Sequence, residues 1–492
     1  MKNDIHDLSL VLDSKVKLIV IESWDEPRVL ETLTGLAVKR GLGLYTWSVT
    51  EGIRHLGFGG DTLDAESTDP IVALRLIKAD PQSSLYVLCD LHPFLTGDPK
   101  PIRLLKEIAM AEGVQRPTVV LVSHQLRLPA EVQRYAAHFS LSLPGEDELL
   151  AIVREEATRW SERNRGARVR TDNRTLQQVV KNLRGLSHGE ARALARNVIC
   201  DDGAITQEDL PELNKTKFKL LDLEGVLGFE YETARFAEVG GLANLKRWLG
   251  ERQHAFLGGE GRDTPRGVLL VGVQGGGKSL AAKAVAGLWG LPLLRLDFAC
   301  LYNKYFGETE RNLREALRLA EQMAPCVLWL DEMEKGLAQG DQDGGVSQRV
   351  LGTLLTWMAE RKSPVFLVAT ANAVHRLPPE LLRKGRFDEL FFVDLPSEAV
   401  RADIFRIHLA RRELAPEAFD LDVLARASEG FSGAEIEQAI VSALYAAQAR
   451  QGQVDQGLLL NQLGATAPLS VVMAEALGEL RAWARGRTVS AD

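Results

Sequence analysis

The sequence predicts an α/β fold of two tandem modules of the phosphate-loop type, each a parallel sheet with flanking helices followed by a small helical lid. Three observations favour this fold. A glycine-rich loop stands between a strand-like run and a helical pattern, apolar runs alternate with helical patterns in both halves, and parts of the first half recur in the second. The 492 residues are enough for two to four domains.

The expected domain boundaries follow changes of pattern along the chain. A degenerate α/β domain without a phosphate loop is expected at 1–145, with its helical lid at 146–217. An intact α/β core is expected at 218–397, and a helical lid with C-terminal helices at 398–492. Buried strands of the first domain are predicted at the apolar runs 16–21, 85–88 and 119–122.

Residues 272–279 read GVQGGGKS, which fits the spacing Gly-x-x-x-x-Gly-Lys-Ser of a phosphate-binding loop. An apolar run precedes the motif and a helical pattern follows it, which is the context that the motif requires. Its three consecutive glycines let backbone N–H groups turn toward phosphate oxygens. Lys278 is expected to reach the β- and γ-phosphates, and Ser279 to ligate Mg²⁺. The alternative, a glycine-rich turn with a chance Lys-Ser, is disfavoured by the flanking strand and helix.

An internal repeat relates the two halves. The segment 127–131 matches 376–380 at an offset of 249 residues, and a strand-like run ending in Asp90 corresponds to one ending in Asp331. Opposite the phosphate loop, the first half has residues 21–28, which carry three carboxylates and no lysine. We infer that the first half keeps the fold and has lost nucleotide chemistry. Coincidental similarity between two α/β units is the alternative.

Polar residues follow two further strand-like runs of the second half. Asp331 and Glu332 end the run 326–330, and Asn372 follows the run 365–369. Strand C-termini are where such folds place ligands. Asp331 is expected to hold Mg²⁺ through water, Glu332 to polarise the attacking water, and Asn372 to hydrogen-bond the γ-phosphate or that water. Two acids at a strand end are common alone, but here they follow a phosphate loop.

Two other segments are expected to project from the subunit. Arg383 and Arg386 flank Gly385, whose turn points them outward and suits arginine fingers that enter a neighbouring subunit's site. Exposed arginines are usually only solvated, which is the alternative. Tyr305 and Phe306 precede a glycine among charged residues and are expected at a presented loop tip, with a core turn as the alternative.

Composition excludes several classes of protein. The net charge of −8 argues weakly against a general nucleic-acid binder. The arginine-rich segment 159–170 has no aromatic platform, since Trp160 is its one aromatic residue, so a solvated loop is favoured there over a nucleic-acid contact. No run approaches the ~18 apolar residues of a membrane span, and the first residues have no signal pattern. A His-Glu-x-x-His protease motif is absent from the sequence. We therefore expect a cytoplasmic protein, or a protein of the plastid stroma if it is organellar.

Residues from about 235 to 450 resemble the classical clade of AAA+ ATPases. The resemblance is carried, in order, by FAEVGGL, GVQGGGKS, KYFGETE, VLWLDE, ATAN, LLRKGRFD and GFSGAEI. Most of the chain is similar to AAA proteins of some plastids and cyanobacteria known as a hypothetical chloroplast reading frame. The resemblance implies two AAA+ modules, ATP and Mg²⁺ as cofactors, and a hexameric ring with a central pore.

The resemblance also implies roles for individual residues. Tyr305 and Phe306 match the first pore loop, which grips a polypeptide, and Arg383 and Arg386 match the two arginine fingers. Asn372 matches sensor one. The residues expected to contact the nucleotide are Gly240 beside the adenine, Gly272, Val273, Gln274, Gly275, Gly276, Gly277, Lys278, Ser279, Leu280, His408 near the adenosine, and Gly433 and Ala434 of sensor two.

The sequence departs from the family pattern in the phosphate loop. Val273 and Gln274 stand where the family has Pro-Pro, and Gly276 stands where it has Thr. The lost rigidity could weaken nucleotide affinity or slow turnover, although every reacting group is present. The effect of these three residues on affinity stays open.

The leading hypothesis is an ATP-driven remodeller of proteins that acts on a polypeptide substrate or an adaptor, with the first half as a catalytically silent platform. The alternative is an ATP-gated regulatory scaffold that threads no substrate. A nucleic-acid motor is disfavoured by the charge. The sequence does not identify the substrate.

Overall fold

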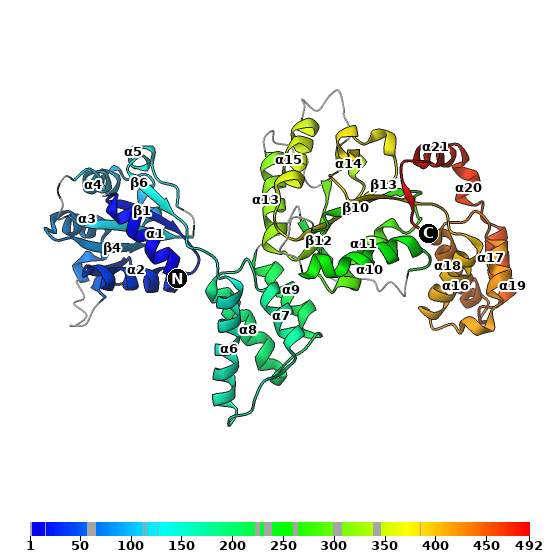
Figure 1. The fold of residues 1–492 in the computed structure, drawn as a ribbon, viewed down its shortest axis with the longest axis horizontal. Coiled ribbons are helices and arrows are strands. Elements are labelled where there is room, and N and C mark those ends of the chain that lie inside the picture. The colour runs from blue at the N-terminus through cyan, green and yellow to red at the C-terminus, as the bar shows by residue number, and fades with distance from the viewer. Residues whose placement is uncertain are drawn as a thin grey trace. The chain divides into compact units, whose positions relative to one another are not determined.

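The computed structural model describes residues 2–14, 16–56, 65–111, 113, 116–124, 126–221, 227–230, 239–258, 264–298, 308–337, 346–383 and 385–492. The chain divides into two compact units. The first comprises Met1–Val169 with Leu186–Gly203, and the second comprises Arg170–Gly185 with Ala204–Asp492 (Figure 1). Each unit contains a largely parallel sheet, so the predicted fold of two tandem α/β modules is confirmed.

In the described part of the first unit, six strands form one sheet in the order β3-β2-β4-β5-β1-β6. Their bounds are β1 Leu18–Glu22, β2 Gly43–Ser48, β3 Gly52–His55, β4 Ser84–Cys89, β5 Thr118–Ser123 and β6 Ala136–Phe139. Pairing is parallel except between β2 and β3. Leu18 and Val20 face one core and Ile19 and Ile21 the other, because strand side chains alternate between faces. Both faces are therefore covered, as the continuous apolar runs predict.

Helices cover the first sheet and continue into a helical pair. The helices of this unit are α1 Lys2–Asp13, α2 Glu26–Arg40, α3 Pro70–Ala79, α4 Pro99–Ala109, α5 Ala130–Gln133, α6 Glu146–Arg163 and α8 His188–Asp202. The helix α8 packs on α6. It begins with a capping box, in which Ser187 accepts from the backbone of Glu190 and the Glu190 side chain accepts from the backbone of Ser187.

In the described part of the second unit, seven strands form a sheet in the order β15-β14-β10-β13-β12-β11-β9. Their bounds are β9 Leu227–Glu230, β10 Gly267–Gly272, β11 Leu293–Leu296, β12 Cys326–Leu330, β13 Val365–Ala371, β14 Glu389–Val393 and β15 Val489–Ser490. Only the pairing of β9 with β11 is antiparallel among these described strands. The central strand β10 lies between β13 and β14, and both faces of it are buried.

The second unit has helices around its sheet and a separate helical core after it. The helices are α7 Asn173–Asn182, α9 Asp209–Leu220, α10 Ala243–Gly258, α11 Lys278–Trp289, α13 Glu308–Gln322, α14 Met333–Leu337, α15 Val346–Glu360, α16 Glu398–Ala410, α17 Leu421–Ala427, α18 Gly433–Ala449, α19 Gln456–Gly464, α20 Leu469–Val472 and α21 Ala474–Ala484. Helices α16 to α19 share a buried cluster that includes Phe405, Leu424, Ile440 and Leu459. This cluster is the core of the second helical lid.

Short elements complete the fold. A two-stranded ladder joins β7 Arg170–Thr171 to β8 Ala204–Ile205, and the described 3-10 turns are η1 Ala65–Thr68, η2 His92–Leu95, η4 Val374–Arg376, η5 Pro379–Leu382 and η6 Pro416–Ala418. Helices α7 and α9 group with the second unit, whereas α6 and α8 group with the first. The domain boundaries expected from the sequence stay predictions.

Within the described residues, no single helix is long and apolar enough to span a membrane. One bent helix pair, Gln456–Val472 with Ala474–Ala484, reaches that length and apolar composition when the two helices are taken together.

Candidate nucleotide site

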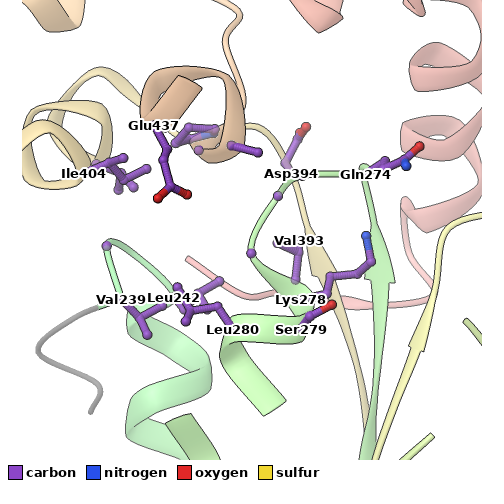
Figure 2. Close-up of a pocket in the computed structure, with 18 of the residues that line it drawn as sticks. Val239, Leu242, Gln274, Lys278, Ser279, Leu280, Val393, Asp394, Ile404 and Glu437 are labelled. Atoms are coloured by element: carbon purple, nitrogen blue, oxygen red, sulfur yellow. The ribbon is translucent and has the colours of Figure 1, made fainter. Parts of the chain in front are cut away.

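The loop between β10 and α11 is shaped by glycine. Gly275 and Gly277 have φ of +75° and +95°, a left-handed conformation that a side chain rarely adopts. Gly277 occupies the N-cap position of α11, where its missing side chain leaves the first amides of the helix available to an anion. Figure 2 shows Lys278 and Ser279 directly after this turn, at the start of α11. The backbone is therefore curled at the N-terminus of α11, as the glycine spacing predicts.

Lys278 is held inside the loop that it follows. Its Nζ donates to the carbonyl oxygens of Gly272 at 2.9 Å and Val273 at 2.6 Å. Burial lowers the pKa of the Lys278 ammonium to about 8, against the opposing effect of the nearby carboxylates, Glu334 foremost. The ammonium thus sits in a low-dielectric position, where its attraction to a phosphate is stronger than in water.

The first residues of the loop pack closely against β14. A Cβ on Gly272 would lie 2.0 Å from the carbonyl oxygen of Val393, so the close passage of β10 along β14 requires glycine there. A Cβ on Gly276 would lie 3.0 Å from the carbonyl oxygen of Val273 and 3.4 Å from Cγ1 of Val393. The space above Gly276 is therefore tight, which gives a physical reason for glycine at a position where the family has Thr.

Asp331 is fixed by two partners at the end of β12. Strand register pairs Leu330 with Ala369, so Asp331 lies beside Thr370. The Thr370 hydroxyl donates to Asp331 Oδ1 at 2.7 Å, and Arg295 Nη2 donates to Asp331 Oδ2 at 3.0 Å. A carboxylate held in this way keeps one orientation at the ligand edge of the sheet.

Glu332 and Asn372 contact each other. Asn372 Nδ2 donates to Glu332 Oε1 at 3.0 Å, while Lys335 forms an ion pair with Glu332 Oε2. The backbone of Glu332 is left-handed, with φ of +47°, and its N–H donates to the hydroxyl of Thr370 at 3.0 Å. The backbone N–H of Asn372 donates to Glu334 at 2.9 Å. The two residues expected to handle the attacking water are therefore in direct contact, just beyond the ends of β12 and β13.

The helical lid closes on the phosphate loop. The N–H of Ala434, in the first turn of α18, lies 3.4 Å from the carbonyl oxygen of Gly275. On α16, burial lowers the pKa of His408, whose Nδ1 lies 3.5 Å from Glu437 Oε1. A Cβ on Gly240 would lie 2.8 Å from Cγ1 of Ile404, so the segment before α10 also passes close to the lid.

These elements enclose one cavity of about 460 Å³, within the range of small-ligand sites. Of the residues expected from the sequence, it is lined by Gly240, Gln274, Gly275, Gly276, Gly277, Lys278, Ser279, Leu280, Asp331, Glu332, Asn372, His408, Gly433 and Ala434. Further lining residues are Val239, Leu242, Thr370, Val393, Asp394, Pro396, Val400, Ile404, Ile407, Arg411, Glu437 and Asp492. Figure 2 shows Ile404 and Glu437 entering from lid helices, and Val239 and Leu242 from the segment that leads into α10.

Comparison with known proteins decides the family. Residues 268–395 match the ATPase family associated with various cellular activities (AAA), and residues 418–456 match the AAA+ lid domain. Residues 4–141 and 147–224 match the N-terminal and second domains of SpoVK-like AAA ATPases. A protein of Trieres chinensis, described as uncharacterized AAA domain-containing protein ycf46, is 34% identical, over 97% of this chain and 96% of its own length. This chain belongs to the AAA ATPase family.

Other relatives of this AAA ATPase fall into two groups by coverage. The ycf46 protein of Pyropia yezoensis is 33% identical over 98% of both chains. The proteasome-activating nucleotidase of Aeropyrum pernix is 38% identical, over 44% of this chain and 56% of its own length. The likeness to ycf46 proteins therefore includes the first unit, whereas the likeness to the nucleotidase is partial.

Gly272 and Val273, which were expected to contact the nucleotide, are not among the described residues that line the cavity, and neither are the two arginines expected to enter a neighbouring site. Arg383 is exposed, and Arg386 Nη1 donates to the carbonyl oxygen of Leu355 on α15 at 2.9 Å. Both stand apart from the described residues that line the cavity. Tyr305 and Phe306, the expected pore loop, lie outside the described residues. The roles assigned to all of these residues stay predictions, as do those of the cavity residues.

The first unit of the AAA ATPase has a carboxylate where the second has glycine. Asp25 is the N-cap of α2, the helix that corresponds to α11, and its Oδ1 accepts from the N–H of Arg28 at 3.3 Å. The Ser123 hydroxyl donates to Asp90 at 2.8 Å, which repeats the contact of Thr370 with Asp331 in the second unit. The two units thus share a hydroxyl–carboxylate contact at the strand ends, and the first has an acidic N-cap where the second has glycine.

Proposed function

We propose that this AAA ATPase hydrolyses ATP in the cavity between the second sheet and its lid, and uses the energy to remodel proteins as a ring-forming oligomer. The supporting observation is that one cavity joins Lys278, Asp331, Glu332 and Asn372 to the first turn of the lid helix α18. A phosphate-loop lysine, two strand-end carboxylates and a polar sensor are the groups that phosphoryl transfer needs.

The residues present fit both ATP and Mg²⁺. The amides of the loop and of the start of α11 would hold the β- and γ-phosphates, because both are backbone donors at a helix N-terminus. The hydroxyl of Ser279 and the carboxylate of Asp331 would hold Mg²⁺, which prefers oxygen ligands. When bound, Mg²⁺ supplies positive charge that offsets the charge on the phosphates.

The chemical step would fall to Glu332. Its carboxylate would orient and polarise the attacking water, and Asn372 would set the direction of that carboxylate through their contact at 3.0 Å. Lys278 would stabilise the charge that develops on the phosphates. His408 and Gly240, at the lid end of the cavity, would contact the adenosine.

The arginines support a ring. Arg383 and Arg386 lie apart from the cavity of their own subunit, and Arg383 is exposed. We infer that they complete the site of the next subunit in a hexamer, where their charge would stabilise the transition state. Catalysis would then require assembly.

Protein remodelling is supported by sequence similarity to another AAA protein and by the predicted pore loop. The partial likeness to a proteasome-activating nucleotidase and the motif around Tyr305 and Phe306 favour work on a polypeptide. The first unit would be a silent platform, because Asp25 and its acidic neighbours would repel a triphosphate. The second candidate, an ATP-gated scaffold, rests on the same cavity. Full biological function of Tyr305→Ala with unchanged ATPase would favour the scaffold.

The proposed activity is tested by turnover. We expect Glu332→Gln to bind ATP and to hydrolyse it at least about 100-fold more slowly than the unmodified protein. We expect Lys278→Ala to lose ATP binding. Rates like those of the unmodified protein in both variants would remove the enzymatic proposal. The Glu332→Gln protein held in ATP should also retain bound substrates or adaptors, which a pull-down would identify.

A further inference from the structure

The last residues of the sequence are built into the nucleotide-binding unit. In β15, Val489 and Ser490 pair in parallel with Phe391 and Phe392 of β14. The N–H of Ala491 continues the ladder by donating to the carbonyl oxygen of Phe392 at 2.9 Å, and Ala491 is 1% exposed. This tail is therefore an edge strand of the sheet that carries the phosphate loop.

The same tail ends on the N-terminus of α10. The carbonyl oxygen of Ala491 accepts from the N–H groups of Asn244 at 3.0 Å and Leu245 at 3.1 Å. Asp492 Oδ1 accepts from the N–H of Leu242 and from that of Ala243 at 3.4 Å. The first amides of a helix have no partner within the helix, so the tail serves as its cap although 250 residues separate Leu242 from Asp492.

The capped segment has an unusual backbone. Gly241 and Leu242 have φ of +67° and +58°, and a left-handed conformation is unfavourable for leucine. Such residues persist only where their surroundings hold them. Asp492 provides that hold, because its carboxylate receives the N–H of Leu242. A Cβ on Gly241 would lie 2.7 Å from Asp492 Oδ1, so the carboxylate also limits which residue can stand there.

This segment forms the wall of the cavity on the side of the lid. Val239, Gly240, Leu242 and Asp492 all line the cavity that contains the phosphate loop. The carbonyl oxygen of Val239 is held as well, because Lys246 Nζ donates to it at 2.6 Å. The wall is therefore fixed from two sides, by α10 and by the tail.

We propose that Asp492 is a positioning residue of the nucleotide site, which holds residues 240–242 in the shape that receives the adenosine end of the ligand. This inference rests on the proposed binding of ATP. It predicts that loss of the Asp492 carboxylate weakens contacts to base and ribose and leaves contacts to phosphate intact, because the phosphate loop has no bond to the tail among the described residues.

The test compares ADP, which has an adenosine end, with pyrophosphate, which has none. In the full chain with Mg²⁺, we expect Asp492→Ala to raise the Kd of ADP about fivefold or more by calorimetry. Pyrophosphate should compete with ADP for the site, and its Kd for Asp492→Ala should equal its Kd for the unmodified protein. Asp492→Asn keeps an oxygen acceptor and should restore most of the ADP affinity.

Asp455→Ala is the matched control. Asp455 is also a helix N-cap, accepting from the N–H of Leu458 at 2.8 Å at the start of α19, and it lies outside the cavity lining among the described residues. Asp455→Ala should lower the melting temperature by about as much as Asp492→Ala does, and it should leave the Kd for ADP unchanged. An equal change of Kd in both variants, an unchanged Kd in Asp492→Ala, or an equal loss of pyrophosphate binding would overturn the inference. Failure of the unmodified protein to bind ADP would instead overturn the proposed function.

Discussion

The amide of Asn372 and the carboxylate of Glu332 are in direct contact, with Nδ2 donating to Oε1 at 3.0 Å. Lys335 takes the other carboxylate oxygen. The group proposed to polarise water therefore contacts one neighbour directly after β13 and one on α14. Since the N–H of Asn372 is itself held by Glu334 at 2.9 Å, any movement of the end of β13 would change the direction of Glu332.

Removal of the amide should slow the reaction with little effect on binding. We expect Asn372→Ala to lower kcat about 10- to 100-fold, because a misdirected base loses reactive geometry, and to leave the Kd of ATP within about threefold. Single-turnover kinetics and calorimetry would separate the two quantities. The control is Lys335→Ala, since the Lys335 side chain is 68% exposed and its ion pair with Glu332 should matter less. An equal fall of kcat in both variants would contradict the proposed role of Asn372.

Arg383 should act on the neighbouring subunit. We expect Arg383→Ala to fold normally, because its side chain is exposed, and to lose about 100-fold or more in kcat. Mixing it with Glu332→Gln subunits should restore part of the activity, because these supply an intact Arg383 to the intact site of the other variant. Activity that stays at the level of the separate variants over a range of mixing ratios would argue against action between subunits.

Lys217 should make stability depend on pH. It is fully buried on α9, its Nζ donates to the carbonyl oxygen of Arg184 at 2.5 Å, and burial lowers its pKa to about 7. Between pH 7 and the unfolded pKa near 10, the unfolded state binds this proton and the folded state does not. The stability of the unmodified protein should therefore rise with pH in this window, by about 1.4 kcal/mol per pH unit at most.

Lys217→Met should remove this pH dependence. We expect the variant to melt at a higher temperature than the unmodified protein at pH 7, and the difference to shrink toward pH 9. Lys219→Met, at an exposed position of the same helix, is the control and should show a difference that does not change with pH. A constant difference for Lys217→Met would mean that Lys217 keeps its proton in the folded protein.

Two glycines of the second unit should respond oppositely to alanine. Gly272→Ala places a Cβ 2.0 Å from a backbone oxygen and should destabilise the unit by about 1–3 kcal/mol. Gly250→Ala, within α10, meets no atom within 4 Å among the described residues and should stabilise it by about 0.5–1 kcal/mol. Thermal unfolding of both variants checks the signs. A Gly272→Ala protein of unchanged stability would show that β10 and β14 can separate locally.

Asp25 should hold the first unit together. Its Oδ2 accepts from the N–H of Gly189 in the first turn of α8 at 3.0 Å, while its Oδ1 caps α2. We expect Asp25→Ala to destabilise this unit by about 1–2 kcal/mol and to increase hydrogen exchange at the start of α8. Asp98→Ala, which removes the cap of α4 alone, should leave exchange in α8 unchanged.

Features with a local signal were accessible from the sequence. The turn before Lys278 follows from three glycines after a buried strand, and Asp331, Glu332 and Asn372 each stand within three residues of the end of an apolar run. Because parallel strands end at the same edge, their meeting in one cavity follows from the topology. The repeat predicted the resemblance of the two modules, including the acidic residue that replaces glycine at the first phosphate position.

Features set by distant contacts were not accessible. The contribution of Asp492 depends on the register of β15 beside β14. The sequence pattern near residue 492 does not predict this register. The side chain of Val273 is buried and is not among the described cavity lining, and its N–H donates to Val393 of β14, a contact that the sequence pattern does not predict. Its expected contact with the nucleotide stays a prediction. The pairing of Lys278 with the carbonyls of its own loop likewise depends on three-dimensional shape.

The edge strand β15 also bears on how the protein is made. A ribosome completes the glycine turn long before it reaches Asp492, so a nascent chain carries α10 with its first amides uncapped and Leu242 without its carboxylate partner. If the tail positions the cavity wall as proposed, tight nucleotide binding begins only after translation has passed that residue. Products truncated before β15 would then hold nucleotide weakly, and incorporation into a working ring would favour chains synthesised through Asp492.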